Sequence, residues 1–177
     1  VGAQANEVFA STEVLSAVGG VMDQFGLEKN NVAHTYALYW VVYWGLANKV
    51  YDAPSADAMQ AVAVQAERGF ANSADFAAMD NSQKQATAEE LMALNAIMDA
   101  SSEQAKSDPS LAAQLAKAAL VGSRKSGLDL DKMNLTEDGF VPRSKKRSDA
   151  GDVIDSDQAL ASATPAQEDH SLTSTNL

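Results

Sequence analysis

Apolar residues recur at helical spacing in five stretches of the chain, and each stretch predicts a helix. The first covers residues 12–25, after which Gly26 stands where a left-handed C-terminal cap is expected. The pair Gly19-Gly20 interrupts the pattern, because each glycine costs a helix about 1 kcal/mol relative to alanine. Close contact with a neighbouring helix would explain the pair. The apolar stripe of this helix comprises Val14, Leu15, Val18, Val21, Met22 and Phe25.

The second stretch carries both tryptophans and all four tyrosines of the chain. Its sequence is HTYALYWVVYWGLANKVY, over residues 34–51. Asn31 is a suitable N-cap, and the helix is expected to run to about residue 50. Residues 38–46 are apolar on every side, so we expect this helix to have neighbours all round it, at the centre of a bundle.

Two further helices are predicted by their caps and their apolar stripes. Ser55 is the expected N-cap of a helix over residues 56–70. Asp80 and Gln83 form a potential capping box for a long helix that ends near residue 106. The stripes comprise Met59, Val62, Ala66 and Phe70 in the third helix, and Leu91, Leu94, Ile97 and Met98 in the fourth.

The fifth helix has the clearest start. In the sequence SDPS, Asp108 is the expected N-cap, and Pro109 takes the first helical position, where its missing N–H is not needed. The helix is expected to end near Arg124, with Gly127 as its terminator. Its stripe comprises Leu111, Leu115, Ala118, Ala119 and Val121.

No stretch predicts a β-sheet. The segment LDLDKMNL, residues 128–135, alternates between apolar and polar positions, but it has no second run with which to pair. We therefore expect an all-α, single-domain bundle of about five helices around the aromatic helix, over residues 11–142. Residues 143–177 are poor in large apolar side chains and rich in Ser, Thr, Ala, Asp and Gln, a composition typical of a disordered tail.

The composition excludes several function classes. The formal net charge of −11 argues against nucleic-acid binding, because clustered Lys and Arg are what hold a phosphate backbone. The absence of cysteine excludes disulfides, thiol catalysis and cysteine-ligated metals. Neither a nucleotide-binding loop nor a serine-hydrolase motif is present. No catalytic residue and no cofactor is predicted.

Residues 1–10 raise the question of export. The chain begins without Met, and Ala3-Gln4-Ala5 has the pattern of small residues that precedes signal-peptidase cleavage. We therefore predict that this segment includes the end of a secretory signal and that the protein is secreted or periplasmic. The alternative is an ordinary terminus of an alanine-rich cytoplasmic protein.

The aromatic helix admits three roles. Its unbroken apolar stretch, residues 37–47, is shorter than the about 20 residues that a membrane-spanning helix needs, so no transmembrane segment is predicted. A core helix is our first interpretation. A pocket-lining helix is the alternative, because tyrosine hydroxyls need polar partners. The ligand contacts would then be Tyr36, Tyr39, Trp40, Tyr43 and Trp44.

No metal site is predicted. His34, the only histidine of the predicted bundle, is expected in the first turn of its helix and partly exposed, without the companion ligands of a metal centre. The segment DLDKMNLTEDG fails to match a calcium-binding EF-hand loop at positions 5, 6 and 12. Its apolar residues and those around it are instead expected to pack over the bundle. They are Leu128, Leu130, Met133, Leu135 and Phe140.

The one basic cluster is RSKKR, residues 143–147. We interpret it as part of the solvated tail, since acidic residues follow it and compensate its charge. The alternatives are a processing site, a targeting element or an electrostatic contact.

Four segments together carry a resemblance to a known family: NNVAHTYALYWVVYW, QAVAVQAERGFA, QKQATAEELMALNAIMDA and GLDLDKMNLTEDGFVP. Over residues 11–142 the chain resembles a bacterial family of small exported proteins known only as a domain of unknown function. The resemblance implies an all-helical domain, usually behind a signal peptide. It implies no activity and no catalytic residues.

These observations predict a non-enzymatic, exported helical domain that binds a protein partner or a small apolar ligand. The alternative is an envelope-acting hydrolase whose acid and base would be carboxylates that the sequence does not single out.

Overall fold

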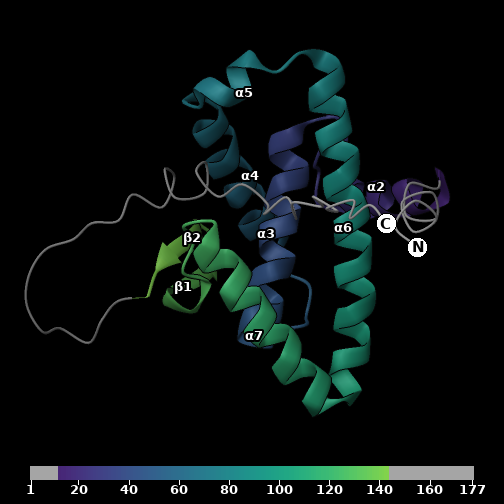
Figure 1. Cartoon of the computed structure of the whole chain (residues 1–177), viewed down its shortest axis with the longest axis vertical. Coiled ribbons are helices and arrows are strands. Elements are labelled where there is room, and N and C mark those ends of the chain that lie inside the picture. The colour runs from purple at the N-terminus through teal and green to yellow at the C-terminus, as the bar shows by residue number, and fades with distance from the viewer. Residues whose placement is uncertain (1–11, 144–177) are drawn as a thin grey trace, which may run out of the picture.

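The computed structural model describes residues 12–143, and its element labels are those of Figure 1. The predicted signal segment and nearly all of the predicted tail lie outside the described residues. The all-α architecture around a central aromatic helix is confirmed. The elements are α2 (Thr12–Gln24), α3 (Val32–Asn48), α4 (Ala56–Ala71), α5 (Ala74–Ala78), α6 (Asn81–Ser107), α7 (Pro109–Lys125), the 3-10 helix η1 (Leu130–Lys132), and the strands β1 (Met133–Thr136) and β2 (Gly139–Pro142).

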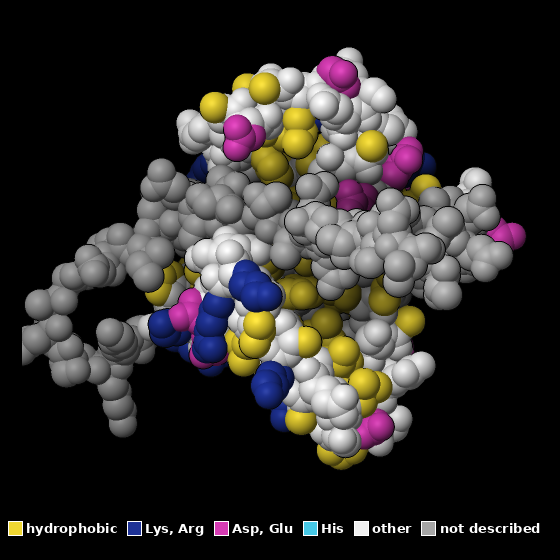
Figure 2. Space-filling view, viewed as in Figure 1, with side chains coloured by type: hydrophobic (Ala, Val, Ile, Leu, Met, Phe, Trp, Pro, Cys, Tyr) yellow, Lys and Arg dark blue, Asp and Glu magenta, His cyan; other side chains and the backbone are white. Residues whose placement is uncertain are grey.

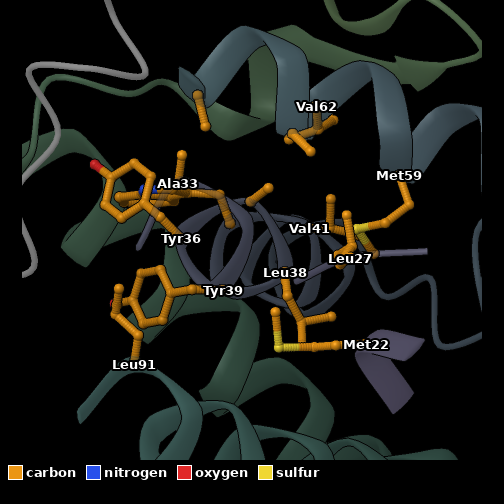
Figure 3. Packing of buried hydrophobic residues seen from close by; sticks show 14 of the residues in the cluster. Met22, Leu27, Ala33, Tyr36, Leu38, Tyr39, Val41, Met59, Val62 and Leu91 are labelled. Atoms are coloured by element: carbon orange, nitrogen blue, oxygen red, sulfur yellow. The ribbon is translucent and has the colours of Figure 1, made fainter. Parts of the chain in front are cut away.

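Helix α3 is the centre of the bundle and packs against α4, α6 and α7. In Figure 1 it runs behind α7, between α4 and the long helix α6. Figure 3 shows that its side chains leave the helix in every direction. Leu38 points toward Met22 of α2. On another side of the helix, Tyr39 lies near Leu91 of α6. Neighbouring elements therefore cover most of α3, as its sequence predicts, while Val42, Tyr43 and Trp44 are only partly buried.

The predicted helix starts are confirmed by the side chains that cap them. Asn31, Ser55 and Asp108 each accept a hydrogen bond from a backbone N–H of the first turn that follows. Asp80 and Gln83 form the complete reciprocal capping box. These contacts satisfy N–H groups that have no acceptor inside their own helix.

Four of the five predicted helix ends agree with the structure to within one residue, the end of α3 being the exception. Gly26 and Gly127 adopt left-handed φ angles of 68° and 83°. Helix α3, in contrast, ends at Asn48 rather than near residue 50. Lys49 takes the left-handed conformation there, with a φ angle of 57°, and its N–H bonds back to carbonyls of the last turn. A non-glycine terminator of this kind carries no clear sequence signal.

The prediction that the chain has no sheet is wrong at the C-terminal end of the domain. Strand β1 pairs antiparallel with β2, and Leu135 stands opposite Phe140. The partner of the alternating segment is GFVP, which follows a turn at residues 137–138. The turn closes because Gly139 adopts a φ angle of 88°, and because the Thr136 hydroxyl accepts a hydrogen bond from the N–H of Asp138.

Gln65 of α4 fixes this hairpin to the bundle. Its Nε2 donates to the carbonyl oxygen of Phe140 at 3.1 Å, and its Oε1 accepts from the N–H of Phe140 at 2.9 Å. The side-chain amide thereby pairs with the strand as a third strand would. The predicted packing over the bundle is confirmed: Leu128, Leu130, Met133 and Phe140 are buried, and Leu135 is partly buried.

Four positions that were predicted in apolar stripes are exposed: Val21, Ile97, Ala118 and Val121. The reason is clearest in α7, whose buried side chains are only Ala112, Ala116, Ala119 and Ser123. This narrow row of small residues is what faces the bundle, so positions beside it remain in solvent.

Arg143 is the first residue of the predicted tail, but it belongs to the fold. Its backbone N–H donates to the carbonyl of Lys132 at 2.7 Å. Its guanidinium donates to the carbonyl of Met133 at 3.2 Å, to Oδ1 of Asn134 at 3.0 Å and to Oδ1 of Asn48. The interpretation of Arg143 as solvated tail is therefore wrong. The rest of the basic cluster lies outside the described residues.

Candidate functional site

The five aromatic residues predicted as possible ligand contacts divide into two groups. Tyr36, Tyr39 and Trp40 are only 3%, 7% and 1% exposed. Tyr43 and Trp44 are partly buried at the edge of the core. The first group therefore belongs to the interior of the bundle.

The aromatic cluster is held by edge-to-face contacts around Trp40. Its ring lies 5.1 Å from that of Tyr39 and 5.6 Å from that of Tyr43, with interplanar angles of 86° and 85°. Tyr36 extends the cluster to Phe70 of α4, with ring centroids 5.1 Å apart. Such pairs add about 0.5–1.5 kcal/mol each beyond the burial of their area. The cluster is a core that joins α3 to α4.

Burial also governs the chemistry of these tyrosines. It raises the pKa of Tyr36 well above the usual value, and the neighbouring Trp40 opposes this only in part. Burial, followed by the nearby Tyr43, raises the pKa of Tyr39 in the same direction. Within residues 12–143, neither the Tyr36 hydroxyl nor the Trp40 indole nitrogen makes a hydrogen bond of ordinary geometry. These phenols stay neutral and are not suited to acid–base chemistry near neutral pH.

A cleft of about 570 Å³ opens on a different face of α3. Its apolar lining comes from five places: α2, α3, the loop before α4, the first turn of α4, and β1. The apolar lining residues are Val21, Phe25, Leu38, Val41, Val42, Trp44, Val50, Tyr51, Ala53, Pro54, Ala58, Met59 and Leu135. Of the five aromatic residues predicted as ligand contacts, Trp44 alone is among the lining residues of this cleft.

The wall formed by the hairpin is attached to the last turn of α3. The indole Nε1 of Trp44 donates to the carbonyl of Met133 at 3.0 Å. The Nδ2 of Asn48 donates to the carbonyl of Leu130 at 3.3 Å. Together with Gln65 on α4, these contacts hold Leu135 and the turn that follows it beside the cleft.

Polar groups border the same cleft. Helix α6 presents Asp99, Ser102, Glu103 and Lys106, which share one face because they are three and four residues apart. Lys106 pairs with Glu103, and this hydrogen bond raises the pKa of Lys106, with a further contribution from the charges of Asp52 and Asp99. The loop before α4 brings Tyr51 and Asp52 to the cleft, and the hairpin turn brings Glu137.

Tyr51 supplies an unusual polar atom. Its ring lines the cleft, and its hydroxyl is buried without a hydrogen-bond partner among the described residues. A buried hydroxyl without a partner costs about 1–3 kcal/mol. Because that oxygen is itself buried, it is the ring of Tyr51, and not its hydroxyl, that faces the cleft.

His34 has a structural role, and its predicted place in the first turn of the helix is confirmed. Its Nδ1 accepts a hydrogen bond from the N–H of Glu28 at 2.8 Å, and its Nε2 lies 2.9 Å from Oε1 of Glu67. The first bond assigns the ring proton to Nε2, which then donates to Glu67. The imidazole thus joins the loop before α3 to α4.

Basic side chains gather at another place on the molecule. In Figure 2, Lys and Arg cluster where α7 ends beside the hairpin. There the Arg124 guanidinium contacts Asp129 at 2.9 Å and Asp131 at 2.8 Å, and Lys132 pairs with Asp129. These cations are therefore engaged by carboxylates of η1 and of the residue before it.

Sequence reasoning missed most of the residues that form the cleft. Asp99, Glu103 and Lys106 have the spacing of a solvent-exposed helix face. Tyr51 was noted as the last tyrosine of the aromatic stretch and was not among the predicted ligand contacts. No local signal marks the place where a charged helix face passes opposite an apolar loop.

The fold defines a helical domain with a small C-terminal hairpin and an apolar cleft at the side of its central helix. Over residues 3–143 the chain matches the model of the family described as "Family of unknown function (DUF6683)", and it belongs to that family. This confirms the resemblance to a family of unknown function. No curated protein and no solved structure matches the chain. Among residues 12–143, no helix combines the length and the apolar character needed to cross a bilayer.

Proposed function

We propose that this chain is a non-enzymatic binding domain that holds a small apolar ligand in the cleft beside α3. The cleft itself is the observation that carries the proposal: its volume of about 570 Å³ lies within the range of about 300–1,000 Å³ that is usual for small-molecule sites. Its lining combines many apolar side chains with a few polar groups, the composition expected of such a site.

A small ligand fits these observations better than a protein partner. A stable protein interface buries about 800 Å² on each side. The large hydrophobic side chains that are exposed within residues 12–143 lie on separate elements, on α2, α4, α6, α7 and the loop before α4. Two of them, Val21 and Val50, belong to the cleft lining, and Val64, Ile97 and Val121 lie outside it.

The test is a titration with the neutral fluorescent probe N-phenyl-1-naphthylamine. We expect saturable fluorescence enhancement and a rise in melting temperature, because a ligand that binds only the folded state stabilises it. Val21→Gln and Val50→Gln, at exposed valines of the cleft lining, should each weaken binding about fivefold, since each loses about 1 kcal/mol of apolar contact.

Matched controls are available on the same surface. Val64 and Val121 are similarly exposed, at 40% and 47%, and lie outside the cleft lining. Val64→Gln and Val121→Gln should leave the affinity unchanged. Equal losses in all four variants, or no saturable binding at all, would refute the proposal.

The same protein preparation tests for hydrolysis. The carboxylates that border the cleft are all exposed, and no buried position singles out one pair as acid and base. Incubation with cell-wall and glycan substrates is therefore expected to release no product. Turnover that is lost in Asp99→Asn or Glu103→Gln would establish the envelope-acting hydrolase instead.

The exported location remains a prediction from the motif Ala3-Gln4-Ala5. It requires a basic segment and an apolar run of about 7–15 residues upstream of Val1 in the precursor. A polar upstream sequence would contradict it.

A further inference from the structure

The rim of the cleft is acidic. Four carboxylates line it, those of Asp52, Asp99, Glu103 and Glu137, against the single ammonium group of Lys106. They come from three elements that are far apart in the chain: the loop before α4, the helix α6 and the hairpin turn. The folded chain thus brings negative charge from separate segments to one opening.

Lys106 neutralises only part of this charge, because one ammonium group stands against four carboxylates. Its Nζ lies 2.5 Å from Oε1 of Glu103. The one ammonium group of the lining is therefore already paired with one of the four carboxylates. Within the described part of the chain, the carboxylates of Asp52, Asp99 and Glu137 make no hydrogen bond and no ion pair. Uncompensated charges of one sign at an opening with apolar walls concentrate the field there and attract counter-ions.

Aromatic rings line the same cleft as these acids. Trp44, Tyr51 and Phe25 all line the cleft, and Tyr51 directly precedes Asp52 in the loop. The faces of Trp and Tyr rings attract cations, and an ammonium group is well recognised where such rings and carboxylates occur together. The apolar floor below them accepts a hydrocarbon chain.

We propose that the ligand of this cleft is a small cationic amphiphile, with its alkyl chain on the apolar floor and its ammonium head group among Asp52, Asp99 and Glu137. This inference rests on the proposed function and adds the charge of the ligand to it. An anionic amphiphile with the same chain would meet three carboxylates and is disfavoured by repulsion.

The experiment compares three ligands that share a decyl chain, each used below its critical micelle concentration. They are decyltrimethylammonium, decyl glucoside and decanoate, titrated by calorimetry into the full 177-residue chain. We expect the ammonium compound to bind about tenfold more tightly than the glucoside and decanoate to bind most weakly. The preference should shrink between about 20 mM and about 500 mM salt, because rim charges are screened.

Substitutions on α6 assign the preference to the rim. Asp99→Asn should weaken binding of the ammonium compound about two- to fivefold, the size of an exposed ion pair, and leave binding of the glucoside unchanged. Lys106→Gln should strengthen binding of the ammonium compound by a similar factor, because it removes the competing cation. Glu90→Gln is the control, because it removes an exposed acid of the same helix that lies outside the cleft. It should change neither the affinity for the ammonium compound nor the affinity for the glucoside.

Each outcome is decisive. Equal affinity for the three ligands would overturn the charge preference and leave the proposed function standing. Tighter binding of decanoate would overturn it as well, since Lys106 would then be the recognition element. Absence of binding by all three, together with failure of the neutral probe, would overturn both proposals.

Discussion

Replacing Gln65 tests how the hairpin, and with it one wall of the cleft, is held in place. Gln65 is 8% exposed, and its amide satisfies both the N–H and the carbonyl of Phe140, whose side chain is fully buried. Gln65→Leu keeps approximately the same volume but leaves both backbone groups without a partner. An unsatisfied buried donor or acceptor costs about 1–3 kcal/mol, so the expected loss of unfolding free energy is about 2–6 kcal/mol.

The assay is urea denaturation followed by circular dichroism at the helix band. The midpoint should fall while the slope stays nearly constant, because the surface exposed on unfolding changes little. Gln104→Leu makes the same substitution at an exposed position of α6 and is the matched control, expected to lie within about 0.5 kcal/mol of the wild type. A loss below about 0.5 kcal/mol in Gln65→Leu would refute the pairing.

Gln65→Glu sharpens the test. The introduced carboxylate would still accept from the N–H of Phe140, but it would face the carbonyl oxygen of Phe140 with no proton to donate. Burial beside that oxygen raises its pKa, so the variant should be unstable at neutral pH and regain stability as the pH falls and the group becomes a donor. If the difference in unfolding free energy between the wild type and Gln65→Glu instead grows as the pH falls, the proposed contact with Phe140 is contradicted.

Three other predictions concern the core and one ion-pair cluster. Trp40→Ala should cost about 3–5 kcal/mol of unfolding free energy, because Trp40 is 1% exposed and a cavity replaces its ring; a loss near zero would contradict the core assignment. Trp44→Phe leaves Trp40 as the one indole, so its emission should be blue-shifted and resistant to iodide. Hydrogen bonding with Asp131, and then with neighbouring Lys and Arg side chains, holds the pKa of Asp129 well below its usual range. Asp129→Asn should therefore cost about 0.5–1 kcal/mol at neutral pH, and the difference should disappear progressively below the ordinary Asp pKa of about 3.9 in pH-dependent denaturation.

The helices could be predicted because their information is local. A capping residue acts within one turn, as Asp80 and Gln83 do, and the apolar period repeats every turn. The packing of Gly19 was also predictable, since a Cβ there would lie 3.9 Å from Met92 of α6 and 3.3 Å from the side chain of Lys29. Gly20 has no such neighbour within the part of the chain that the structure describes, so the pair has only half of the expected explanation.

The hairpin could not be predicted in the same way, because what completes it is distant in sequence. Phe140 and Gln65 are 75 positions apart, and a glutamine on α4 gives no sign that it will bind a strand. Gly139 shows how tight the contact is: a Cβ at that position would lie 2.5 Å from Oε1 of Gln65. Two strands of four residues are too short to be recognised without this partner.

The candidate site could not be predicted from the sequence for a different reason. Most of the aromatic residues of α3, which are the most noticeable feature of the sequence, face the core. Helical geometry directs Tyr36, Trp40 and Tyr43 to the aromatic core, while the face of α3 that borders the cleft carries Val41 and Val42. Branched aliphatic residues look the same in sequence whether a helix or a ligand covers them. What distinguishes this face is the set of acids placed opposite it by α6, the loop before α4 and the hairpin turn, and that arrangement exists only once the chain is folded. The proposed binding site therefore rests on the charge that the fold places around an apolar opening, rather than on the most conspicuous motif of the sequence.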